Sequence, residues 1–468
     1  MINFFNFKGL DEHNSRYLIT NDLGRYLFVS KDELVSLIRN KVDYASNFGK
    51  IAVSNYFCYN GSLQAFTEQL KPLYRDSKNY LFTATSLHIF VVTNACNMKC
   101  VYCQAQNGKI LPNGMMSKET AKKAVDIAMS CPTPCISIEF QGGEPLINFE
   151  VIKYIVEYAD QIAIENNKTV EYNLVSNLTL LTDEIIDYIH QHNIGVSTSI
   201  DGDEILHDQN RMLRDNQGSY QLVMQGINRL RSHGVEFGAI QTTTRKSLTK
   251  ARDIIDTYVS LGLHSVFIRN LTPLGCASEH WLEIGYSAKE FVAFYKECFD
   301  YILELNLAGV DIQEGHATLM LSKILSGYAV NYMELRSPCG AGVGQIAYYY
   351  DGNIYTCDEG RMLAEMGNDA FKLGTIDDSY DDLMNCDNCK AACVSSVLES
   401  LPSCSDCIYS PFCGTCPVIN YALGQDIYCH EPNDYKCLIY KGILDTIFDA
   451  LQVSEKEKIL KSWVEKGE

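Results

Sequence analysis

Leu87–Gln104 reads LHIFVVTNACNMKCVYCQ, an apolar run followed at once by three closely spaced cysteines. The run LHIFVVT (Leu87–Thr93) is short, continuous and rich in β-branched residues, which is typical of a strand buried on both faces. The cysteines follow where this strand ends. The strand therefore opens the part of the chain that decides the fold.

Strand-like and helix-like segments alternate from this point on. The alternation predicts a parallel sheet with helices outside it, and functional groups at the carboxyl ends of the strands. Six β/α units are too few to close an eight-stranded barrel, so we expect an open, partial barrel. The expected strands are 87–93, 135–140, 169–175, 195–200, 235–242 and 265–269, with helices at 118–129, 149–165, 182–192, 219–233 and 249–261.

The three cysteines have the spacing C-x3-C-x2-C. Thiolates are soft ligands that suit iron–sulfur clusters. Three of them in one loop can hold three irons of a [4Fe–4S] cluster and leave the fourth iron open to another molecule. A zinc knuckle would need a fourth ligand, and His88 falls inside the strand. The spacing favours an iron–sulfur cluster on Cys96, Cys100 and Cys103.

The composition is that of an acidic globular protein. The 468 residues include 39 Lys and Arg against 58 Asp and Glu, a net charge of −19, and 46% are hydrophobic. A chain of this length usually forms two or three domains. Its acidity argues against nucleic acid as a partner, because phosphate binding needs a basic surface, and against an anionic membrane. A cationic peptide is an easier partner.

The ends and the cysteines of the chain predict a cytoplasmic protein. Residues 1–14 lack the basic start and apolar run of a secretory signal. No apolar run reaches the roughly 18 residues of a membrane span. Clustered cysteines then favour metal binding or redox work over disulfides. Of the nineteen, five are scattered and expected to be small buried hydrophobes: Cys58, Cys131, Cys135, Cys276 and Cys298.

The first 85 residues predict a small separate unit. Residues 16–30 read RYLITNDLGRYLFVS, two strand-like runs around a turn, and helical patterns follow from Lys31 and around 62–74. Such an order fits a winged-helix-like module. The expected domains are this module at 1–85, the partial barrel at 86–275, a helical bridge at 276–335, a cysteine-rich region with little apolar core that folds around metal at 336–440, and a C-terminal helix at 441–468.

The cysteine spacing, with Tyr102 before the last cysteine, resembles the radical S-adenosylmethionine (SAM) superfamily. The resemblance continues at Gly142-Gly143-Glu144-Pro145, which follows the second strand and matches the GGEP motif of that family. Two glycines let the backbone approach a ligand closely, and a carboxylate can accept from an ammonium. The resemblance implies that Tyr102, Gly142, Gly143 and Glu144 bind SAM, the last three at its methionine amino group.

The ends of the third and fourth strands extend the resemblance. The third strand ends in Ser176-Asn177, where the family has a Thr-Asn-Gly type of sequence, but Leu178 follows here. The resemblance implies that Ser176 and Asn177 line the SAM site.

The fourth strand reads STSIDG and is followed by His207-Asp208 and Arg211, similar to an S-L-D-G…H-D-x2-R stretch of the family. The resemblance implies that Ser199 and Arg211 reach the ribose and carboxylate of SAM. Helix capping is the alternative for Asp201 and Asp208.

The resemblance implies a definite chemistry. A reduced cluster gives one electron to SAM at the open iron, the C5′–S bond breaks, and the resulting 5′-deoxyadenosyl radical takes a hydrogen from an unactivated C–H group. The protein supplies orientation and a dry pocket. A flavodoxin or ferredoxin is the expected reducing partner.

The C-terminal cysteines resemble the twin-cluster domain called SPASM. Its G-x4-C step is present at Gly352–Cys357, followed by C-x2-C-x5-C-x2-C from Cys404 to Cys416. Paired C-x2-C steps can also hold zinc. The resemblance implies two auxiliary clusters, expected to be [4Fe–4S], one on Cys404, Cys407, Cys413 and Cys437 and the other on Cys339, Cys357 and Cys416.

Two points in this region stay open in the sequence. The second ligand set lacks a fourth member, because the C-x3-C step of the family is C-x2-C here, and Cys429 competes with Cys437 in the first set. The pattern also does not predict Cys386, Cys389 and Cys393. They either supply the missing ligand or are surface thiols, and we expect surface thiols.

Longer matches narrow the resemblance. Segments 85–93, 141–146, 267–275 and 357–367 together resemble the radical maturase of the His-Xaa-Ser repeat peptide system. This implies a ribosomally made precursor peptide as substrate and a second radical SAM maturase as a further partner. The N-terminal module would capture the leader peptide as an added strand; a purely structural cap is the alternative.

Three polar residues are candidates for the chemistry. Asp358 and Glu359 follow the expected ligand Cys357 and are candidates for the base that takes a proton as a cross-link closes. Pairing of one of them with Arg361 is the structural alternative. Arg269 lies at the carboxyl end of a strand, where barrels place functional groups.

Three functions compete. The first is a radical SAM maturase that modifies, and by our expectation cross-links, side chains of a ribosomally made peptide. The second is an anaerobic sulfatase-maturating type of enzyme that oxidises Cys or Ser to formylglycine. The third is a non-catalytic zinc or iron–sulfur scaffold. The same machinery serves the first two, so a neighbouring sulfatase gene or short-peptide gene would discriminate between them.

Overall fold

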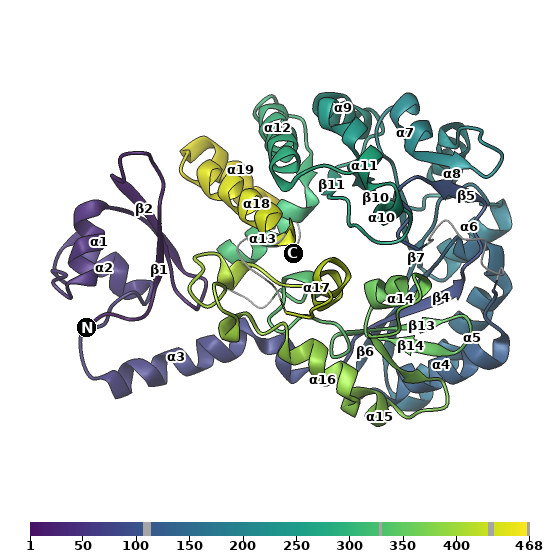
Figure 1. Cartoon of the computed structure of the whole chain (residues 1–468), viewed down its shortest axis with the longest axis horizontal. Coiled ribbons are helices and arrows are strands. Elements are labelled where there is room, and N and C mark those ends of the chain that lie inside the picture. Colours follow the sequence, from purple (N-terminus) through teal and green to yellow (C-terminus); the bar gives the residue numbers. More distant parts are fainter. Residues whose placement is uncertain (106–113, 327–329, 429–434, 466–468) are drawn as a thin grey trace.

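The computed structural model describes residues 1–105, 114–326, 330–428 and 435–465. Its main element is a ten-stranded sheet in the order β12-β11-β10-β8-β7-β6-β4-β13-β14-β15 (Figure 1). The strands from β12 to β13 pair in parallel, and within the described residues the sheet does not close. The predicted α/β class with an open, partial barrel is confirmed. The strands are β4 (Leu87–Thr93), β6 (Cys135–Gly142), β7 (Thr169–Val175), β8 (Gly195–Ser199), β10 (Phe237–Thr242), β11 (Ser265–Arg269), β12 (Gln313–Glu314), β13 (Gln345–Tyr349), β14 (Asn353–Tyr355) and β15 (Lys372–Thr375).

Helices cover the outer side of the parallel strands (Figure 1). They begin at the predicted caps: Ser117 Oγ accepts the backbone N–H of Thr120, and Thr182 Oγ1 accepts that of Ile185. Each cap satisfies a backbone donor that has no partner inside the helix. The helices are α4 (Lys118–Ser130), α5 (Phe149–Asn166), α6 (Asp183–Gln191), α7 (Glu204–Asn210), α8 (Tyr220–Ser232), α9 (Ala251–Ser260), α10 (Cys276–Glu279), α11 (Trp281–Ile284) and α12 (Ala288–Leu307).

The last three strands of the sheet come from the cysteine-rich region, which corrects one prediction. β13 pairs in parallel with β4, from Gln345 opposite Leu87 to Tyr349 opposite Val91, and all five of its residues are buried. The expectation of little apolar core is wrong here, because the run QIAYY continues the sheet beside β4. The helices of this region are α14 (Asp358–Glu365), α15 (Tyr380–Asn385), α16 (Asp387–Val394) and α17 (Pro417–Gly424).

The N-terminal module contains the predicted hairpin and helices. β2 (Arg16–Thr20) and β3 (Tyr26–Ser30) pair antiparallel, and β1 (Asn6–Gly9) adds a third strand that the sequence did not indicate. A capping box of Ser30 and Glu33 starts the first helix. The helices are α1 (Lys31–Ile38), α2 (Asn47–Ser54) and α3 (Leu63–Ser77).

The C-terminal segment forms two helices, α18 (Tyr435–Leu451) and α19 (Ser454–Glu465), rather than the single predicted one. Phe448 of α18 contacts Tyr26 of β3, with ring centroids 5.4 Å apart. The Trp463 indole of α19 donates to Asn306 of α12 at 2.9 Å. These two helices, with α13 (Gly315–Leu325) of the bridge, therefore join the N-terminal module to the barrel. In the part of the chain that the structure describes, no helix is long and apolar enough to cross a membrane.

Candidate functional site

The cysteine loop (residues 94–103) places its thiols beside a short ladder. β5 (Met98–Cys100) pairs with β9 (Arg211–Leu213), so Cys100 lies opposite Arg211. Burial, together with the neighbouring thiol of Cys100, raises the pKa of Cys96 to about 12. The Cys103 thiol interacts with both of the others, and its pKa is raised as well, chiefly by burial. A half-buried group of thiols suits iron, because iron binds the thiolates and compensates their charge.

A fourth thiol, that of Cys276, lies beside the three. Its backbone N–H donates to the Cys103 carbonyl at 2.9 Å, and its thiol interacts electrostatically with Cys100 and Cys103. The prediction of a small buried hydrophobe is therefore wrong for Cys276, and it is also wrong for Cys135, whose thiol is exposed. Cys276 lies far from the cysteine loop in the sequence, so no cysteine spacing predicts this contact.

Tyr102, Asp201 and Arg211 form a buried chain of hydrogen bonds. The Tyr102 hydroxyl donates to the Asp201 carboxylate at 2.9 Å, and Arg211 Nη1 donates to the Tyr102 oxygen at 2.8 Å. Arg211 Nε has no hydrogen-bond partner among the described residues. A buried guanidinium with a spare donor fits an anionic ligand group such as the carboxylate of SAM.

The capping alternative holds for only one of the two aspartates. Asp208 accepts the backbone N–H of Tyr220 at 2.8 Å, at the start of α8. Asp201 caps no helix, since the cap of α7 is Asp203, and instead accepts from Tyr102. Asp201 therefore belongs to the hydrogen-bonded chain beside the cysteine loop.

The Gly-Gly-Glu-Pro turn after β6 packs directly on the cysteine loop. A Cβ at Gly142 would lie 2.2 Å from the Thr93 carbonyl oxygen, and one at Gly143 would lie 2.3 Å from that of Ala95. Only glycine fits so close an approach. The turn is therefore built against the strand end that carries the thiols.

Glu144 is fully buried and accepts three hydrogen bonds. They come from the backbone N–H groups of Leu146 (3.1 Å) and Asn177 (2.7 Å) and from Ser176 Oγ (2.8 Å). Burial nevertheless raises the pKa of Glu144. A buried carboxylate held this way fits the ammonium of a ligand.

The end of β7 links Glu144 to the cysteine loop. Asn177 Nδ2 donates to Asn97 Oδ1 at 2.9 Å and lies 4.0 Å from Cys96 Sγ. Leu178, which departs from the family pattern, has φ = 63°, the left-handed region that favours glycine. Ser199 is the last residue of β8 and is half-buried. The structure thus brings Ser176 and Asn177 to Glu144, and Leu178 adopts the left-handed backbone conformation that glycine would favour at this turn.

A second group of thiols lines a cavity between the inner face of β11 and the cysteine-rich region. We call it the thiol cavity. Its lining includes the thiols of Cys339, Cys357 and Cys416, the side chains of Phe267 and Arg269, and the polar residues His316, Glu334, Gln345, Glu359, Lys436 and Tyr440.

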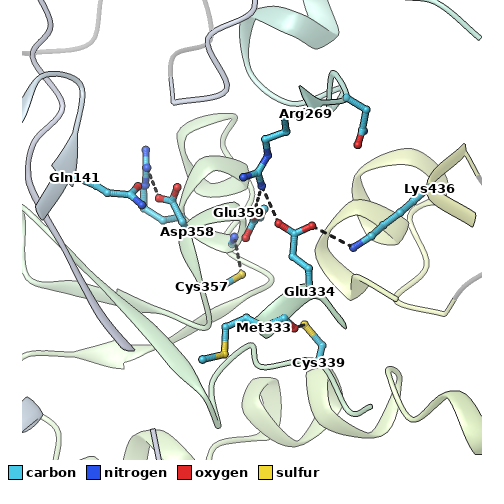
Figure 2. Close-up of polar contacts among 12 residues, drawn as sticks. Gln141, Arg269, Met333, Glu334, Cys339, Cys357, Asp358, Glu359 and Lys436 are labelled. Carbon is cyan, nitrogen blue, oxygen red and sulfur yellow. Dashed lines mark hydrogen bonds and ion pairs between the residues drawn. The ribbon is translucent and has the colours of Figure 1, made fainter. Parts of the chain in front are cut away.

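Glu334 is the centre of the polar network in this cavity (Figure 2). Its carboxylate accepts from Arg269 Nη2 at 2.8 Å and from the Tyr440 hydroxyl at 3.0 Å, and Lys436 Nζ lies 3.7 Å away. Burial opposes ionisation, but the charges of Arg269 and Lys436 lower the pKa of Glu334 to about 2. The sequence did not indicate Glu334, Lys436 or Tyr440, because no motif contains them.

Asp358 and Glu359 have different surroundings. Asp358 pairs with Arg361, a side chain that is 2% exposed, so the structural alternative applies to it. Figure 2 shows Asp358 on the side of Gln141, whereas Glu359 points toward Arg269 at 3.9 Å. Burial raises the pKa of Glu359, and nearby Glu334 adds to this. Of the two candidate bases, only Glu359 lines the thiol cavity.

The other expected ligand set lies nearer the N-terminal module. Cys404 and Cys413 pack in one apolar cluster with Leu398 and Leu401, and the Cys413 thiol interacts with that of Cys407. Cys437 is half-buried in the first turn of α18. The competing residue, Cys429, lies outside the described residues.

The donors fit iron–sulfur clusters by their chemistry. Both the cysteine loop and the thiol cavity offer three thiols, and each thiolate of such a cluster binds a separate iron. Within the described ranges, no three His, Cys, Asp or Glu side chains are gathered around a single point as one metal ion would require.

The model of the radical SAM superfamily matches residues 90–267, the span from β4 to β11. Residues 90–267 are therefore similar to a radical SAM domain. The match contains the cysteine loop, Glu144 and Arg211, and it ends before the thiol cavity is complete. It supports SAM and an iron–sulfur cluster as cofactors and an enzymatic role for the chain.

Two curated relatives extend the comparison. An uncharacterised protein of Methanocaldococcus jannaschii is 34% identical over 40% of this chain and 62% of its own length, so the match spans less than two thirds of that relative. The serine-type anaerobic sulfatase-maturating enzyme of Bacteroides thetaiotaomicron is 26% identical over 80% of this chain and 92% of its own.

Two solved structures have a similar fold. Native anSMEcpe with bound AdoMet superposes with a TM-score of 0.67 at 20% identity, covering 81% of this chain and 99% of its own. Streptococcus suis SuiB bound to the precursor peptide SuiA gives a TM-score of 0.53 at 13% identity, covering 93% of this chain and 99% of its own. At these identities the likeness concerns the fold alone.

Proposed function

We propose that this chain is a radical SAM maturase that cross-links side chains of a ribosomally made precursor peptide. In this proposal it works in the cytoplasm, takes electrons from a flavodoxin or ferredoxin, and acts with a second radical SAM maturase of a His-Xaa-Ser type system. The proposal rests mainly on one observation, the short connection between the cysteine loop and the thiol cavity.

The segment after β11 makes that connection. Thr272 and Pro273 line the thiol cavity, and Cys276 donates to Cys103 of the cysteine loop at 2.9 Å. Three extended residues span at most about 11 Å. One wall of the cavity therefore lies within about 11 Å of the residue that contacts the cysteine loop, beside which the radical would form.

The residues around the cysteine loop have assigned roles in the proposal. Cys96, Cys100 and Cys103 hold a [4Fe–4S] cluster, which with SAM supplies a 5′-deoxyadenosyl radical for hydrogen abstraction. Glu144, oriented by Ser176 and Asn177, accepts from the amino group of SAM, and Gly142 and Gly143 let the backbone approach it. Arg211, steadied by Tyr102, binds the carboxylate of SAM, and Ser199 contacts its ribose.

The residues of the thiol cavity act on the peptide. Glu359 takes the proton released when the cross-link closes, because burial lets it hold a proton and it faces the cavity. Arg269, which holds Glu334 and lies near Glu359, orients the carboxylates. Asp358 is a positioning residue through Arg361. Cys339, Cys357 and Cys416 hold one auxiliary cluster, and Cys404, Cys407, Cys413 and Cys437 hold the other.

The N-terminal module is proposed to bind the leader peptide. β1 and β3 are the edge strands of its three-stranded sheet, and an edge strand can pair with an extended peptide. Coverage supports a role beyond sulfatase maturation: the anSMEcpe structure covers 81% of this chain, whereas SuiB, described with a precursor peptide, covers 93%.

Formylglycine formation is the second candidate. It is favoured by the sulfatase-maturating relative, which matches 80% of this chain at 26% identity. The two functions differ in their product, since formylglycine is an aldehyde and a cross-link is not.

The test is anaerobic co-expression of the chain with short peptides encoded near its gene, followed by mass spectrometry. The proposal predicts a peptide that has lost two hydrogens per cross-link, resists fragmentation between the linked residues, and does not react with a hydrazide. Loss of the modification in Cys100→Ala is the control. A hydrazide-reactive product would establish the formylglycine alternative, and an unmodified peptide would contradict the cross-linking proposal.

A further inference from the structure

Cys386, Cys389 and Cys393 form a third group of thiols, separate from the cysteine loop and the thiol cavity. They lie at the N-cap, in the first turn and in the second turn of α16, a spacing that puts them along one side of the helix. The prediction of surface thiols is wrong for Cys389, which is 1% exposed, and the other two are half-buried.

The contacts of these thiols join them into one unit. The backbone N–H of Cys389 donates to Cys386 Sγ at 3.4 Å, and the thiols of Cys389 and Cys393 are hydrogen-bonded. Cys389 Sγ also packs on Gly342, where a Cβ would lie 2.7 Å from it. Cys389 is therefore held inside the protein, while Cys386 is reachable at the helix start.

The arrangement matches a known requirement for thiol chemistry. A C-x2-C pair whose first cysteine caps a helix has its two thiols within disulfide range. We propose that Cys386 and Cys389 form a thiol–disulfide exchange site, with Cys393 as proton acceptor, that reacts with disulfides of neutral or positive charge.

The exchange has two balanced steps. The Cys386 thiolate attacks one sulfur of the incoming disulfide, forming a mixed disulfide and releasing the other sulfur as a thiolate. Cys389 then passes its proton to Cys393 and attacks Cys386 Sγ, which forms the Cys386–Cys389 disulfide and releases the second thiolate. The partner disulfide is reduced by two electrons and the two cysteines are oxidised. The proton that Cys386 lost to solvent is regained by the first released thiolate, and the Cys389 proton passes from Cys393 to the second.

The surroundings of Cys393 suit this role. The hydrogen bond from Cys389 lowers the pKa of Cys393, and the buried guanidinium of Arg336 adds to the effect. Arg336 also interacts with Cys339 of the thiol cavity, whose backbone N–H donates to Ser396 just after α16 at 3.0 Å. The exchange site therefore adjoins the thiol cavity without sharing its thiols.

The charge around Cys386 selects the disulfide. The residues that precede and start α16 carry exposed aspartates, Asp378, Asp381, Asp382 and Asp387, which outnumber Lys390 of the same helix, whereas Asp377 is paired with Lys123 at 2.7 Å. Such a cluster repels anions and attracts cations at low ionic strength. Cystamine, a dication, should react on the order of tenfold faster than oxidised glutathione, an anion, and added salt should reduce the difference.

The test uses the whole reconstituted chain, reduced, desalted and treated anaerobically with either disulfide. Trypsin releases residues 373–390 as one peptide, in which Cys386 and Cys389 are the only cysteines. The expected product is this peptide with two hydrogens lost and no alkylation. A disulfide-bridged peptide flanked by lysines serves as a third probe, and its reaction would assign a protein partner, whereas reaction with cystamine alone would assign a small molecule.

Variants define the roles of the three thiols. Cys389→Ser should trap the mixed disulfide on Cys386, and Cys393→Ser should slow closure on the order of tenfold without preventing it. Cys135→Ser, which removes an exposed thiol, is the matched control. A 373–390 peptide that stays fully alkylatable with every probe, a disulfide that joins Cys389 to Cys393 instead, or a bound metal lost when all three become serine would overturn the proposal.

Discussion

The cysteine loop and the thiol cavity present the same number of thiols and are built in opposite ways. The three thiols of the loop come from a single turn after β4, so their spacing alone identifies them. Those of the cavity come from three separate segments that meet beside β11. The loop is lined by groups suited to one small ligand, Glu144 and Arg211. The cavity has a shared network of several charges around Glu334.

This difference separates the two tasks that a radical maturase needs. A site assembled within one periodic β/α unit holds a fixed ligand in one geometry. A site that forms between the inner face of the sheet and the cysteine-rich region can tolerate substitution of single lining residues. We therefore expect changes in the loop to stop radical formation altogether, and changes in the cavity to alter what happens to the peptide.

The largest effect is expected at the loop. Cys100→Ala should lower 5′-deoxyadenosine formation by at least about a thousandfold, because the cluster loses one of its three ligands, while iron bound by the C-terminal cysteines remains. Iron content and 5′-deoxyadenosine should be measured on the same sample. Cys135→Ala is the control, since that thiol is exposed. Similar amounts of 5′-deoxyadenosine from Cys100→Ala and Cys135→Ala would contradict the assignment of radical formation to the cysteine loop.

The pair Asp358 and Glu359 tests the cavity. Glu359→Gln should slow peptide modification by roughly 10²–10⁴-fold, the usual loss for a missing general base. The amount of 5′-deoxyadenosine formed in turnovers that do not modify the peptide should change little. Asp358→Asn should instead lower the melting temperature, because Arg361 is left buried without its partner. Equal losses of modification in the two variants would count against Glu359 as the base.

A substitution of Glu144 tests how much this carboxylate contributes to SAM binding beside the cysteine loop. Glu144→Gln removes the charge and places an amide N–H₂ against groups that donate to the carboxylate, among them the backbone N–H of Leu146 or Asn177. The KM for SAM should rise about a hundredfold, as for a buried charge pair that loses one member. Glu171→Gln, on the exposed side of β7, should leave KM unchanged. An unaltered KM in the first variant would show that Glu144 does not bind SAM.

The smallest expected effect is on stability, through a buried carboxyl group in the cysteine-rich region. Burial raises the pKa of Glu365, in α14, from its ordinary 4.5 to about 7. Between these values the unfolded chain ionises while the folded chain keeps its proton, so the free energy of unfolding falls as pH rises from about 5 to 7 and stays low above that.

Glu365→Gln abolishes this titration. The variant should be more stable than the wild type by about 1 kcal/mol at pH 8, a value reduced for partial exposure, and equal to it below pH 4.5. Urea unfolding at pH 4 and pH 8 provides the measurement. A difference between the two proteins that is independent of pH would mean that Glu365 keeps an ordinary pKa.

The sequence predicts the barrel well because its signals are local. The alternation of strands and helices, the caps Ser117 and Thr182, and the spacing of the cysteine loop each depend on a few consecutive residues. The pairing of β13 with β4 and the contact of Cys276 with Cys103 join distant segments, so no local pattern announces them. The same holds for Glu334 and Lys436, whose roles arise only where two regions meet. Leu178 is a different case, since a φ of 63° at a leucine contradicts local preference and is enforced by the fold.

The proposed function depends on one event, the transfer of hydrogen from a peptide at the thiol cavity to the radical made beside the cysteine loop. The direct measurement uses a precursor peptide deuterated at the modified position and mass spectrometry of the 5′-deoxyadenosine formed. The account predicts one deuterium in each 5′-deoxyadenosine released with modified peptide. Modified peptide accompanied by 5′-deoxyadenosine without deuterium would contradict it.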